Sequence, residues 1–442
     1  MIDITEHYTQ QYHSLAENLP GNGVEWIKTY RNNRLSRFQE AGFPTTRDED
    51  WRYTTVRPIT NKKFTSIGDI QVDRYALISS KVAEHSVMDF DSYQLVFVDG
   101  VLMTDFSELT ALGDGVQINS IADVLRQRPE SIQTYFDIDH AEESNGFTEL
   151  NRAFSKDGAV IELQAGVCLE KPLELLFLSF GDEALAQSRN LIVAHEGSKA
   201  TIIERYVSAE TGYSLTNNLS EVVLDKKSEI DYYLVQTQSR DAYQVSGIWV
   251  TQASDSRFSC RTITLGGILV RNEIKIRMLG EGAHCDMFGL YSLSGKQHVD
   301  NHTTVVHGAP NCTSNELYKG VLNQRSRGVF HGRIKVEQDA QKTDAKQSNN
   351  TLLLSRDAEI DTKPQLEIYA DDVKCSHGAT IGQMDEVSLF YLRSRGIDES
   401  DARSLLTFAF VNDVLREVGI DSLKESLESI LSSQLISDRQ TV

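Results

Sequence analysis

The segment Gly197-Ser-Lys-Ala-Thr-Ile-Ile-Glu-Arg-Tyr206 begins as a turn and continues as a run of the kind that forms β-strands. Between Pro172 and Pro310 the chain has no proline, which suits a long stretch of laddered backbone. No helical periodicity separates the successive runs, so a sheet built from βαβ crossovers is not expected. The same order of turn, small residue and alternating run recurs at Lys227-Ser-Glu-Ile, Gly282-Ala-His-Cys, Asp357-Ala-Glu-Ile and Asp372-Val-Lys-Cys.

Residues 146–381 are therefore predicted to be a mainly β core. Two architectures fit this pattern: a sandwich or barrel, or a parallel β-solenoid whose turns stack on one another. The unequal intervals between the turns favour the solenoid, although periodicity alone does not decide between the two. The predicted strands are 159–163, 173–179, 190–194, 200–206, 229–236, 248–251, 262–269, 273–278, 329–336, 351–354 and 365–368.

Residues 1–145 are predicted to form an N-terminal mixed helical domain. Gly42 and Pro44 end a first helix, and Ser120 begins a second one that reaches Arg126. Residues 94–100 are expected to form a strand that runs into an Asp-Gly turn. The first helix is indicated by apolar residues at near-helical spacing, namely Val24, Ile27, Tyr30, Leu35 and Phe38.

Residues 382–442 are predicted to form a C-terminal helical domain. One of its helices is apolar on two sides, so it is either deeply buried or bound to a partner. The first apolar face consists of Ala402, Leu405, Leu406 and Ala409, and the second of Phe408, Val411 and Leu415.

Composition limits the classes of function. The 442 residues carry a formal net charge of -20, which disfavours binding to a nucleic-acid backbone. The first residues do not resemble a secretory signal, and the apolar stretch 173–180 is too short to cross a bilayer. The five cysteines are odd in number and contain no CxxC, as expected in a reducing cytoplasm.

The spacing of histidine and cysteine residues indicates two candidate sites. His298, His302 and His307 are either metal ligands or polar residues of the core, and in a strand the first two would share a face. Cys375 and His377 would also share a face and offer a soft ligand pair for iron or zinc. Two ligands do not complete a metal site, so the remaining ones would come from another chain, a substrate or water.

Several longer motifs resemble the SufB/SufD family of iron–sulfur cluster assembly proteins. The short form Cys375-Ser-His-Gly-Ala-Thr380 is similar to the SufD side of that family. The other matching segments are Gly42-Phe-Pro-Thr-Thr-Arg-Asp-Glu-Asp-Trp-Arg-Tyr-Thr54, His298-Val-Asp300, Tyr318-Lys-Gly320, Thr343-Asp-Ala-Lys-Gln-Ser-Asn-Asn-Thr-Leu-Leu-Leu-Ser355, Ile360-Asp-Thr-Lys-Pro-Gln-Leu-Glu-Ile368 and Leu389-Phe-Tyr-Leu-Arg-Ser-Arg-Gly-Ile397.

The resemblance implies a right-handed parallel β-helix core flanked by helical N- and C-terminal domains, acting as a non-enzymatic scaffold. It implies edge-to-edge pairing with a SufB-like subunit and docking of the ATPase SufC on the C-terminal helices. His377, with Cys375 beside it, would help to form a transient iron–sulfur cluster or bind iron at the SufB interface, and none is expected in the isolated chain. The residues expected to contact the ATPase are Phe390, Tyr391, Arg393, Arg395, Leu405, Phe408, Val411 and Leu415.

Two other readings remain open. A carbohydrate-active β-helix enzyme would need paired carboxylates in a cleft, for which Asp339, Asp344 and Asp357 are the candidates. With only 3 tryptophans, the chain has few indole rings on which the sugars of a carbohydrate substrate could stack. The last reading is a β-helix that forms a homodimer when isolated.

Overall fold

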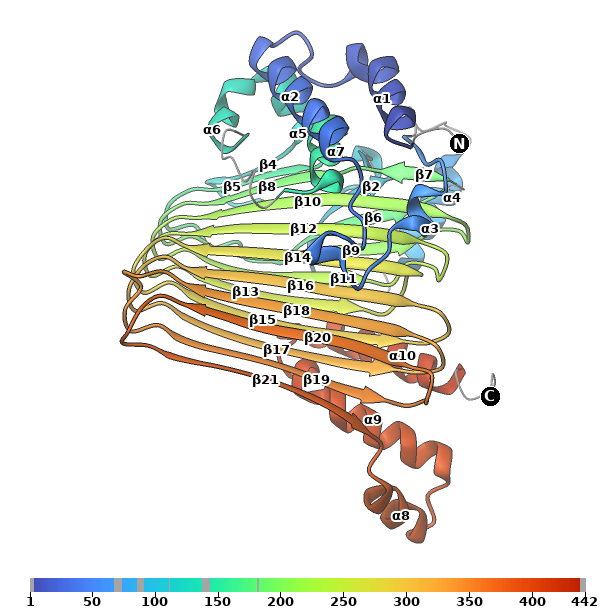
Figure 1. Ribbon diagram of the computed structural model, residues 1–442. Helices are drawn as coiled ribbons and strands as arrows, with labels where there is room; N and C mark the ends of the chain where they lie inside the picture. The colour runs from blue at the N-terminus through green and yellow to red at the C-terminus, as the bar shows by residue number, and fades with distance from the viewer. Residues whose placement is uncertain are drawn as a thin grey trace.

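The computed structural model describes residues 4–66, 74–85, 91–110, 112–136, 144–180 and 183–437. Two large sheets run along the molecule, with helices at the N-terminal end and a second helical group at the C-terminal end (Figure 1). Sheet A has the strand order β20-β18-β16-β14-β12-β10-β8-β5-β4, and sheet B the order β21-β19-β17-β15-β13-β11-β9-β6-β2-β3. Neighbouring strands in each sheet are therefore two apart in the chain.

This connectivity defines a parallel β-solenoid of about 8 turns, as the sequence predicts. Each turn, here called a rung, adds one strand to sheet A and one to sheet B. The later strands have ten residues each and pair in parallel without interruption. They are β14 Leu269–Met278, β15 His284–Leu293, β16 His298–His307, β17 Thr313–Leu322, β18 Arg327–Val336, β19 Asp344–Leu353, β20 Glu359–Ile368 and β21 Lys374–Gln383.

The earlier rungs are less regular. They comprise β5 Ala159–Leu163, β6 Leu173–Ser179, β7 Ala184–Ala186, β8 Arg189–Ala194, β9 Lys199–Ser208, β10 Ser214–Leu224, β11 Glu229–Gln236, β12 Tyr243–Gln252 and β13 Arg257–Thr264. The predicted strand 262–269 is wrong, because β13 ends at Thr264 and a corner precedes Leu269. Gly266 in that corner packs so closely on the previous rung that a Cβ atom would lie 2.1 Å from the Gln238 carbonyl oxygen.

The corners between sheet A and sheet B explain the recurring turn pattern. Lys227 and Asp255 adopt the left-handed conformation, with φ near 60° and 58°, as Gly197 does at 70°. Lys227 N–H donates to the Ser254 carbonyl at 3.0 Å, which ties each corner to the next one. A small buried residue follows the left-handed residue of six successive corners: Ser198, Ser228, Ser256, Ala283, Cys312 and Thr343. The small residue is needed because its side chain points into the crowded interior of the corner.

The interior of the first rungs is packed with apolar side chains. Phe177 stacks on Phe97 and on Tyr206, with ring centroids 4.8 Å and 4.6 Å apart. Glu204 is fully buried in this region and accepts hydrogen bonds from Asn190 Nδ2 at 2.8 Å and Tyr206 Oη at 2.8 Å. Burial raises the pKa of Glu204. The carboxyl is therefore held as part of a hydrogen-bonded polar layer within an otherwise apolar stack.

The N-terminal region contributes both helices and strands. The structure confirms the first predicted helix and shows that Ser120 caps the second by accepting a bond from Asp123 N at 3.2 Å. The predicted strand near residue 94 is present and pairs in parallel with β6 of sheet B. The elements are α1 Ile4–Leu15, α2 Glu25–Ala41, η2 Glu49–Trp51, α3 Arg57–Thr60, β1 Thr65–Ser66, α4 Tyr75–His85, β2 Tyr93–Val98, β3 Val101–Leu102, η4 Thr104–Phe106, β4 Val116–Ser120, α5 Ile121–Gln127, α6 Gln133–Phe136 and α7 Gly146–Phe154, with short 3-10 turns η1 Ala16–Asn18 and η5 Pro129–Ser131.

The C-terminal helices are α8 Glu386–Ser394, α9 Glu399–Leu415 and α10 Asp421–Ser437. The end of α9 and α10 pack on the outer face of sheet B, where Val414 and Leu427 are fully buried near Tyr233. Lys319 Nζ of β17 holds α9 by donating to the Phe410 carbonyl at 2.7 Å. By contrast, α8 extends beyond the end of the solenoid and packs on α9 (Figure 1).

None of the helices among the described residues has the length and apolar character needed to span a membrane.

The aromatic stack yields a prediction about stability. Phe177→Ala removes the ring between Phe97 and Tyr206, so we expect it to lower the free energy of unfolding by about 3–5 kcal/mol. Urea denaturation followed by circular dichroism measures this change. Leu279→Ala is the control, because Leu279 is 55% exposed and its truncation should change the free energy by less than about 0.5 kcal/mol. Equal effects of the two substitutions would contradict the packing described here.

Candidate functional site

The last rung, formed by β20 and β21, ends both sheets. In the part of the chain that the structure describes, each of these strands has a neighbour on one side only. Almost all of β21 is exposed, and Ile381 and Tyr369 are 51% and 59% exposed. A ten-residue strand with a free edge and exposed apolar side chains is a template for pairing with another chain. The open rung is therefore the first candidate for a functional surface.

Cys375 and His377 lie on the same face of β21, as their spacing predicts. Their partners on β19 are Ala345 and Gln347, which are both buried inside the solenoid. The two side chains therefore stand over the interior at its open end. His377 is exposed and Cys375 is half-buried against a small apolar cluster that includes Ala345. A thiol binds a metal as its thiolate, and burial disfavours that form because it raises the pKa of the Cys375 thiol.

The three histidines of β16 have structural partners. His298 and His302 lie on the outer face, and His307 points inward and bonds to Ser314 Oγ at 2.9 Å. His298 Nε2 is 2.9 Å from Thr54 Oγ1. This arrangement agrees with the predicted strand geometry. It supports the interpretation of these residues as polar parts of the core.

His302 also lies near Asp50 and His331, and the three side chains form a group that could hold a metal ion. Arg271 Nη2 lies 3.1 Å from His302 Nδ1. Because a guanidinium only donates, this nitrogen must accept, and the proton of the neutral ring is then on Nε2. The nitrogen that faces Asp50 at 3.8 Å therefore has no lone pair for a metal. Burial of the ring, together with the positive side chains around it, holds the pKa of His302 well below its ordinary value.

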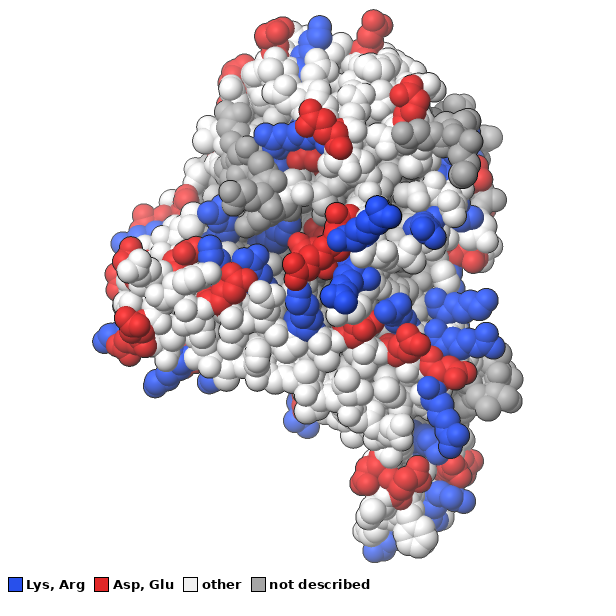
Figure 2. All heavy atoms as spheres, in the orientation of Figure 1, with Lys and Arg blue, Asp and Glu red and all other residues white. Residues whose placement is uncertain are grey.

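The same region fastens the N-terminal part of the chain to sheet A. We call residues 48–54 the strap. Arg271 is fully buried beneath it, with its guanidinium 3.8 Å from the centre of the Trp51 ring and Nη1 3.0 Å from the Asp50 carbonyl oxygen. Thr54 Oγ1 donates to Asp300 at 2.6 Å, and Lys363 pairs with Glu49 at 2.7 Å. Figure 2 shows acidic and basic side chains interspersed over the middle of this face. The predicted motif 42–54 thus acts as a fastening, which sequence reasoning did not find.

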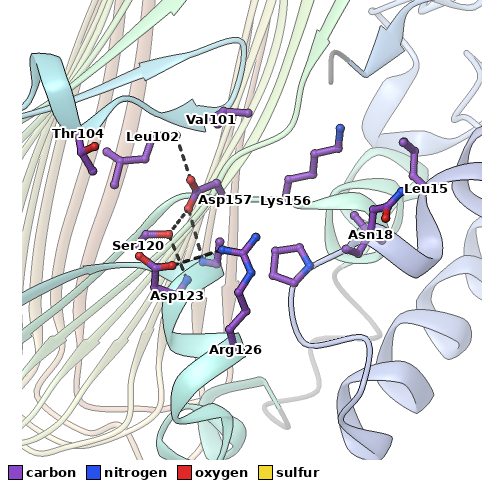
Figure 3. Close-up of a pocket in the computed structure, with 13 residues that line it drawn as sticks. Leu15, Asn18, Val101, Leu102, Thr104, Ser120, Asp123, Arg126, Lys156 and Asp157 are labelled. Carbon is purple, nitrogen blue, oxygen red and sulfur yellow. Dashed lines mark hydrogen bonds and ion pairs between the residues drawn. The ribbon is translucent and has the colours of Figure 1, made fainter. Parts of the chain in front are cut away.

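A cavity of about 660 Å³ lies between the N-terminal helices and the first rungs (Figure 3). Asp157 points into it but accepts hydrogen bonds from Ser120 Oγ at 2.7 Å and Leu102 N at 2.9 Å. Arg126 on its rim pairs with Asp123 at 3.3 Å. These groups are already engaged with one another, so their arrangement favours a structural role over ligand binding.

Asp344 and Asp357, two of the three candidate carboxylates, do not converge, and the third, Asp339, is an exposed residue of the turn before β19. Asp344 begins β19, whereas Asp357 lies in the corner that follows that strand. A ten-residue strand spans about 33 Å, far more than the roughly 5–9.5 Å between the catalytic carboxyls of a glycosidase. This separation excludes Asp344 and Asp357 as the catalytic pair of a carbohydrate-active enzyme.

The predicted ATPase contacts fall into two groups. Phe390, Tyr391 and Leu405 are 73%, 57% and 52% exposed on α8 and the first half of α9. Arg393 is exposed on α8, Arg395 is exposed immediately after that helix ends, and Phe408 on α9 is half-buried. Arg393 pairs with Glu399 at 3.2 Å, and Arg395 lies over the Tyr391 ring at 5.3 Å.

Val411 and Leu415 are also predicted to contact the ATPase, and the structure contradicts this part of the prediction. Both are buried, with 2% and 0% of their surfaces exposed, in the cluster between α9 and sheet B. This side of the two-sided helix therefore faces the chain's own solenoid. We define the arm as residues 386–409, which keep the exposed apolar side.

The fold and the site together define a parallel β-solenoid protein with helical ends, whose candidate site is an open surface at the last rung. The family model described as "SUF system FeS cluster assembly, SufBD core domain" matches residues 177–410. The model of the SufBD protein N-terminal region matches residues 2–175. The chain belongs to the SufBD family of the Suf iron–sulfur cluster assembly system.

Within that family the chain is SufD-like. It is 30% identical over 430 residues to the iron–sulfur cluster assembly protein SufD of Escherichia coli, covering 96% of each chain. It is 30% identical over 406 residues to an iron–sulfur cluster assembly SufBD family protein of Synechocystis, covering 89% of this chain and 88% of the relative. The SufD protein of Bacillus subtilis is 24% identical over 419 residues, covering 93% of this chain and 94% of the relative.

The histidines under the strap yield a prediction about pH. Burial lowers the pKa of His298 to about 4, whereas an unfolded histidine titrates near about 6.5. The unfolded chain therefore binds more protons between these values, so the stabilising contribution is complete above about pH 6.5 and is lost as the pH falls toward 4. We expect His298→Gln to flatten the fall in unfolding free energy between pH 7 and pH 5, measured by urea denaturation. His13→Gln, at an exposed position on α1, should leave the slope unchanged. An unaltered slope in His298→Gln would contradict the prediction.

Proposed function

We propose that this chain is a non-catalytic scaffold subunit for iron–sulfur cluster assembly in the cytoplasm. It pairs with a SufB-like subunit through the open rung and with a SufC-like ABC ATPase through the arm. It contributes to forming the nascent cluster and delivering iron. The observation that carries this proposal is the exposed His377 on the inner face of a terminal strand with a free edge.

The free edges of β20 and β21 support pairing with a second β-solenoid. Two unpaired strand edges and the exposed side chains of Tyr369 and Ile381 come together at one end of the molecule. Hydrogen bonds across the edges would satisfy the backbone groups, and the apolar side chains would be buried. Sequence motifs shared with the SufB/SufD family are concentrated in these last rungs, which favours a SufB-like partner.

The chemistry of the site also calls for a partner. An imidazole and a thiol are ligands that iron accepts, but two of them leave a tetrahedral site half complete. Because His377 is exposed at the open rung, a facing chain could supply the missing ligands without rearranging the solenoid. The cluster is thus a cargo that is built between two chains and released, and the isolated chain would hold no resident cofactor.

The arm supports docking of the ATPase. Its exposed aromatic residues Phe390 and Tyr391 are flanked by arginines, a composition that is enriched in protein interfaces. Because the end of α9 is anchored on sheet B, movement of the ATPase could be transmitted to the solenoid. ATP binding would then shift the population of complexes in which the SufB-facing surface is open or closed.

The first test concerns His377. In a reconstituted assembly reaction with the SufB-like and SufC-like partners under anaerobic conditions, His377→Ala should lower the yield of cluster absorbance by at least about tenfold. Cys375→Ser should also lower it, because the serine keeps the space but is a poor ligand for iron. Ser376→Ala is the matched control, since Ser376 is exposed on the opposite face of the same strand and should leave the yield unchanged.

Full cluster yield with His377→Ala would remove the ligand role. Light scattering of this chain alone and with the SufB-like subunit tests the pairing separately. A heterodimer supports the proposal, whereas a homodimer that persists in the mixture would show that the open rung pairs with a second copy instead.

The second test concerns the arm. Phe390→Asp places a charge in the exposed apolar surface, so we expect it to weaken ATPase binding by about 2 kcal/mol or more, roughly 30-fold in Kd. Isothermal titration measures this. Ile436→Asp is the control, because Ile436 is 52% exposed on α10, outside the arm. Equal affinities for wild type and Phe390→Asp would show that the ATPase docks elsewhere.

A further inference from the structure

We propose that Gln347 positions His377 for metal binding by accepting a hydrogen bond from its ring, and that Glu316 holds the amide of Gln347 in the orientation this requires. This inference rests on the proposed function of His377 and extends it to the residues beneath the site. Gln347 and Glu316 are positioning residues, because neither one would touch the cluster.

The three side chains form one column inside sheet B. Glu316 of β17 pairs with Gln347 of β19, and Gln347 pairs with His377 of β21. Paired residues of parallel strands point to the same face and lie about 4.8 Å apart. Glu316 and Gln347 are buried, with 2% and 1% of their surfaces exposed, and His377 occupies the open end of the column.

The amide of Gln347 has one satisfied side and one unsatisfied side. Its Nε2 donates to Glu316 Oε2 at 2.7 Å. Its Oε1 is buried and, among the described residues, receives no hydrogen bond in this structure. A buried amide oxygen without a donor costs roughly 1–3 kcal/mol, so it is a strong acceptor for any N–H that can reach it. In this column the residue on the open side of Gln347 is His377, whose ring carries an N–H in the neutral form.

The position of Glu316 explains why the oxygen of the Gln347 amide, and not its NH₂ group, lacks a hydrogen-bond partner. An ionised carboxylate only accepts hydrogen bonds, so the NH₂ group of Gln347 must turn toward it. Gly332 on the facing sheet leaves room for this, because a Cβ atom there would lie 2.2 Å from Gln347 Nε2. Burial raises the pKa of Glu316 to about 7, so the carboxylate is the main form at pH 8. The titratable groups that face it in the interior, Cys285 and Tyr318, stay neutral there because burial raises both pKa values further.

The consequence for His377 is a fixed tautomer. When one ring nitrogen donates its proton to Gln347, the other nitrogen presents its lone pair away from the column. Metal-binding histidines commonly have such a partner, which orients the ring and increases its basicity. The buried column would thus prepare the exposed imidazole to bind iron at the moment when the facing chain arrives.

The test uses the full chain at pH 8 with ¹⁵N-labelled histidine. The chemical shifts of the two ring nitrogens report the tautomer, and His377→Ala assigns the signal among the 11 histidines. We expect one tautomer of His377 to dominate in the wild type and a mixture to form in Gln347→Leu. In the reconstituted reaction, the same variant should lower cluster yield by about 10- to 100-fold.

Asn350→Leu is the matched control. Asn350 lies on the same strand but on the outer face, where its Oδ1 accepts from Thr380 Oγ1 at 2.6 Å. The substitution removes an amide of similar size next to β21 and should leave the His377 tautomer unchanged. Glu316→Gln is the second variant, which keeps the shape of the column and so decides the question if Gln347→Leu does not fold. Because a glutamine donates as well as accepts, it should reduce the dominance of one tautomer.

The outcomes separate this inference from the proposed function. A mixed tautomer in the wild type, or one dominant tautomer in both column variants, would overturn the role of Gln347. If His377→Ala nevertheless abolished cluster formation, the ligand role of His377 would stand alone. If the tautomer responded as expected but His377→Ala left the yield unchanged, the hydrogen bond would be real and the proposed function of His377 would be wrong.

Discussion

The structure depends on the hydrogen bonds that join each strand to the strand two further along the chain. In sheet B this register is unbroken from β9 to β21, and the corner bonds, such as that from Lys227 N–H to the Ser254 carbonyl, continue it around the edge. Because each rung is bonded to the next along its whole length, a residue's position in one rung fixes which side chains lie above and below it. From β14 to β21 every strand has ten residues, so these rungs differ in length only in their corners, and extra residues there do not disturb the columns inside.

Those columns change in character along the molecule. Near the N-terminal end they contain aromatic stacks such as Phe97, Phe177 and Tyr206, with one polar layer around Glu204. Near the open rung the interior includes Glu316 and Gln347, which leave polar atoms unsatisfied. An apolar interior stabilises the stack, whereas a polar interior costs stability and is usually retained for another reason. The position of this polar column directly beneath His377 provides such a reason.

The sequence was sufficient to predict the β core, many of its strands and the capped helix at Ser120, because these depend on local patterns. It also predicted that Cys375 and His377 share a face, since strand geometry alone requires it. It failed at 262–269, where apolar residues continue through a Gly-Gly corner and hide the break between two strands. It could not place Arg271 beneath Asp50, whose separation in the chain is 221 residues, nor tell which face of α9 was covered. The polar column was missed because the register of β17, β19 and β21 cannot be read from residue types.

The strap has a consequence for how the chain matures. Glu49 is joined to Lys363, which is 314 residues further along the chain. At a synthesis rate of about 5–20 residues per second, the N-terminal segment leaves the ribosome roughly 15–60 s before the lysine that completes its binding surface. During that interval Trp51 and its neighbours have no finished sheet to cover. The Glu49–Lys363 ion pair is therefore among the last contacts that the nascent chain can form, whereas the contacts of the strap with Arg271 and Asp300 can form earlier.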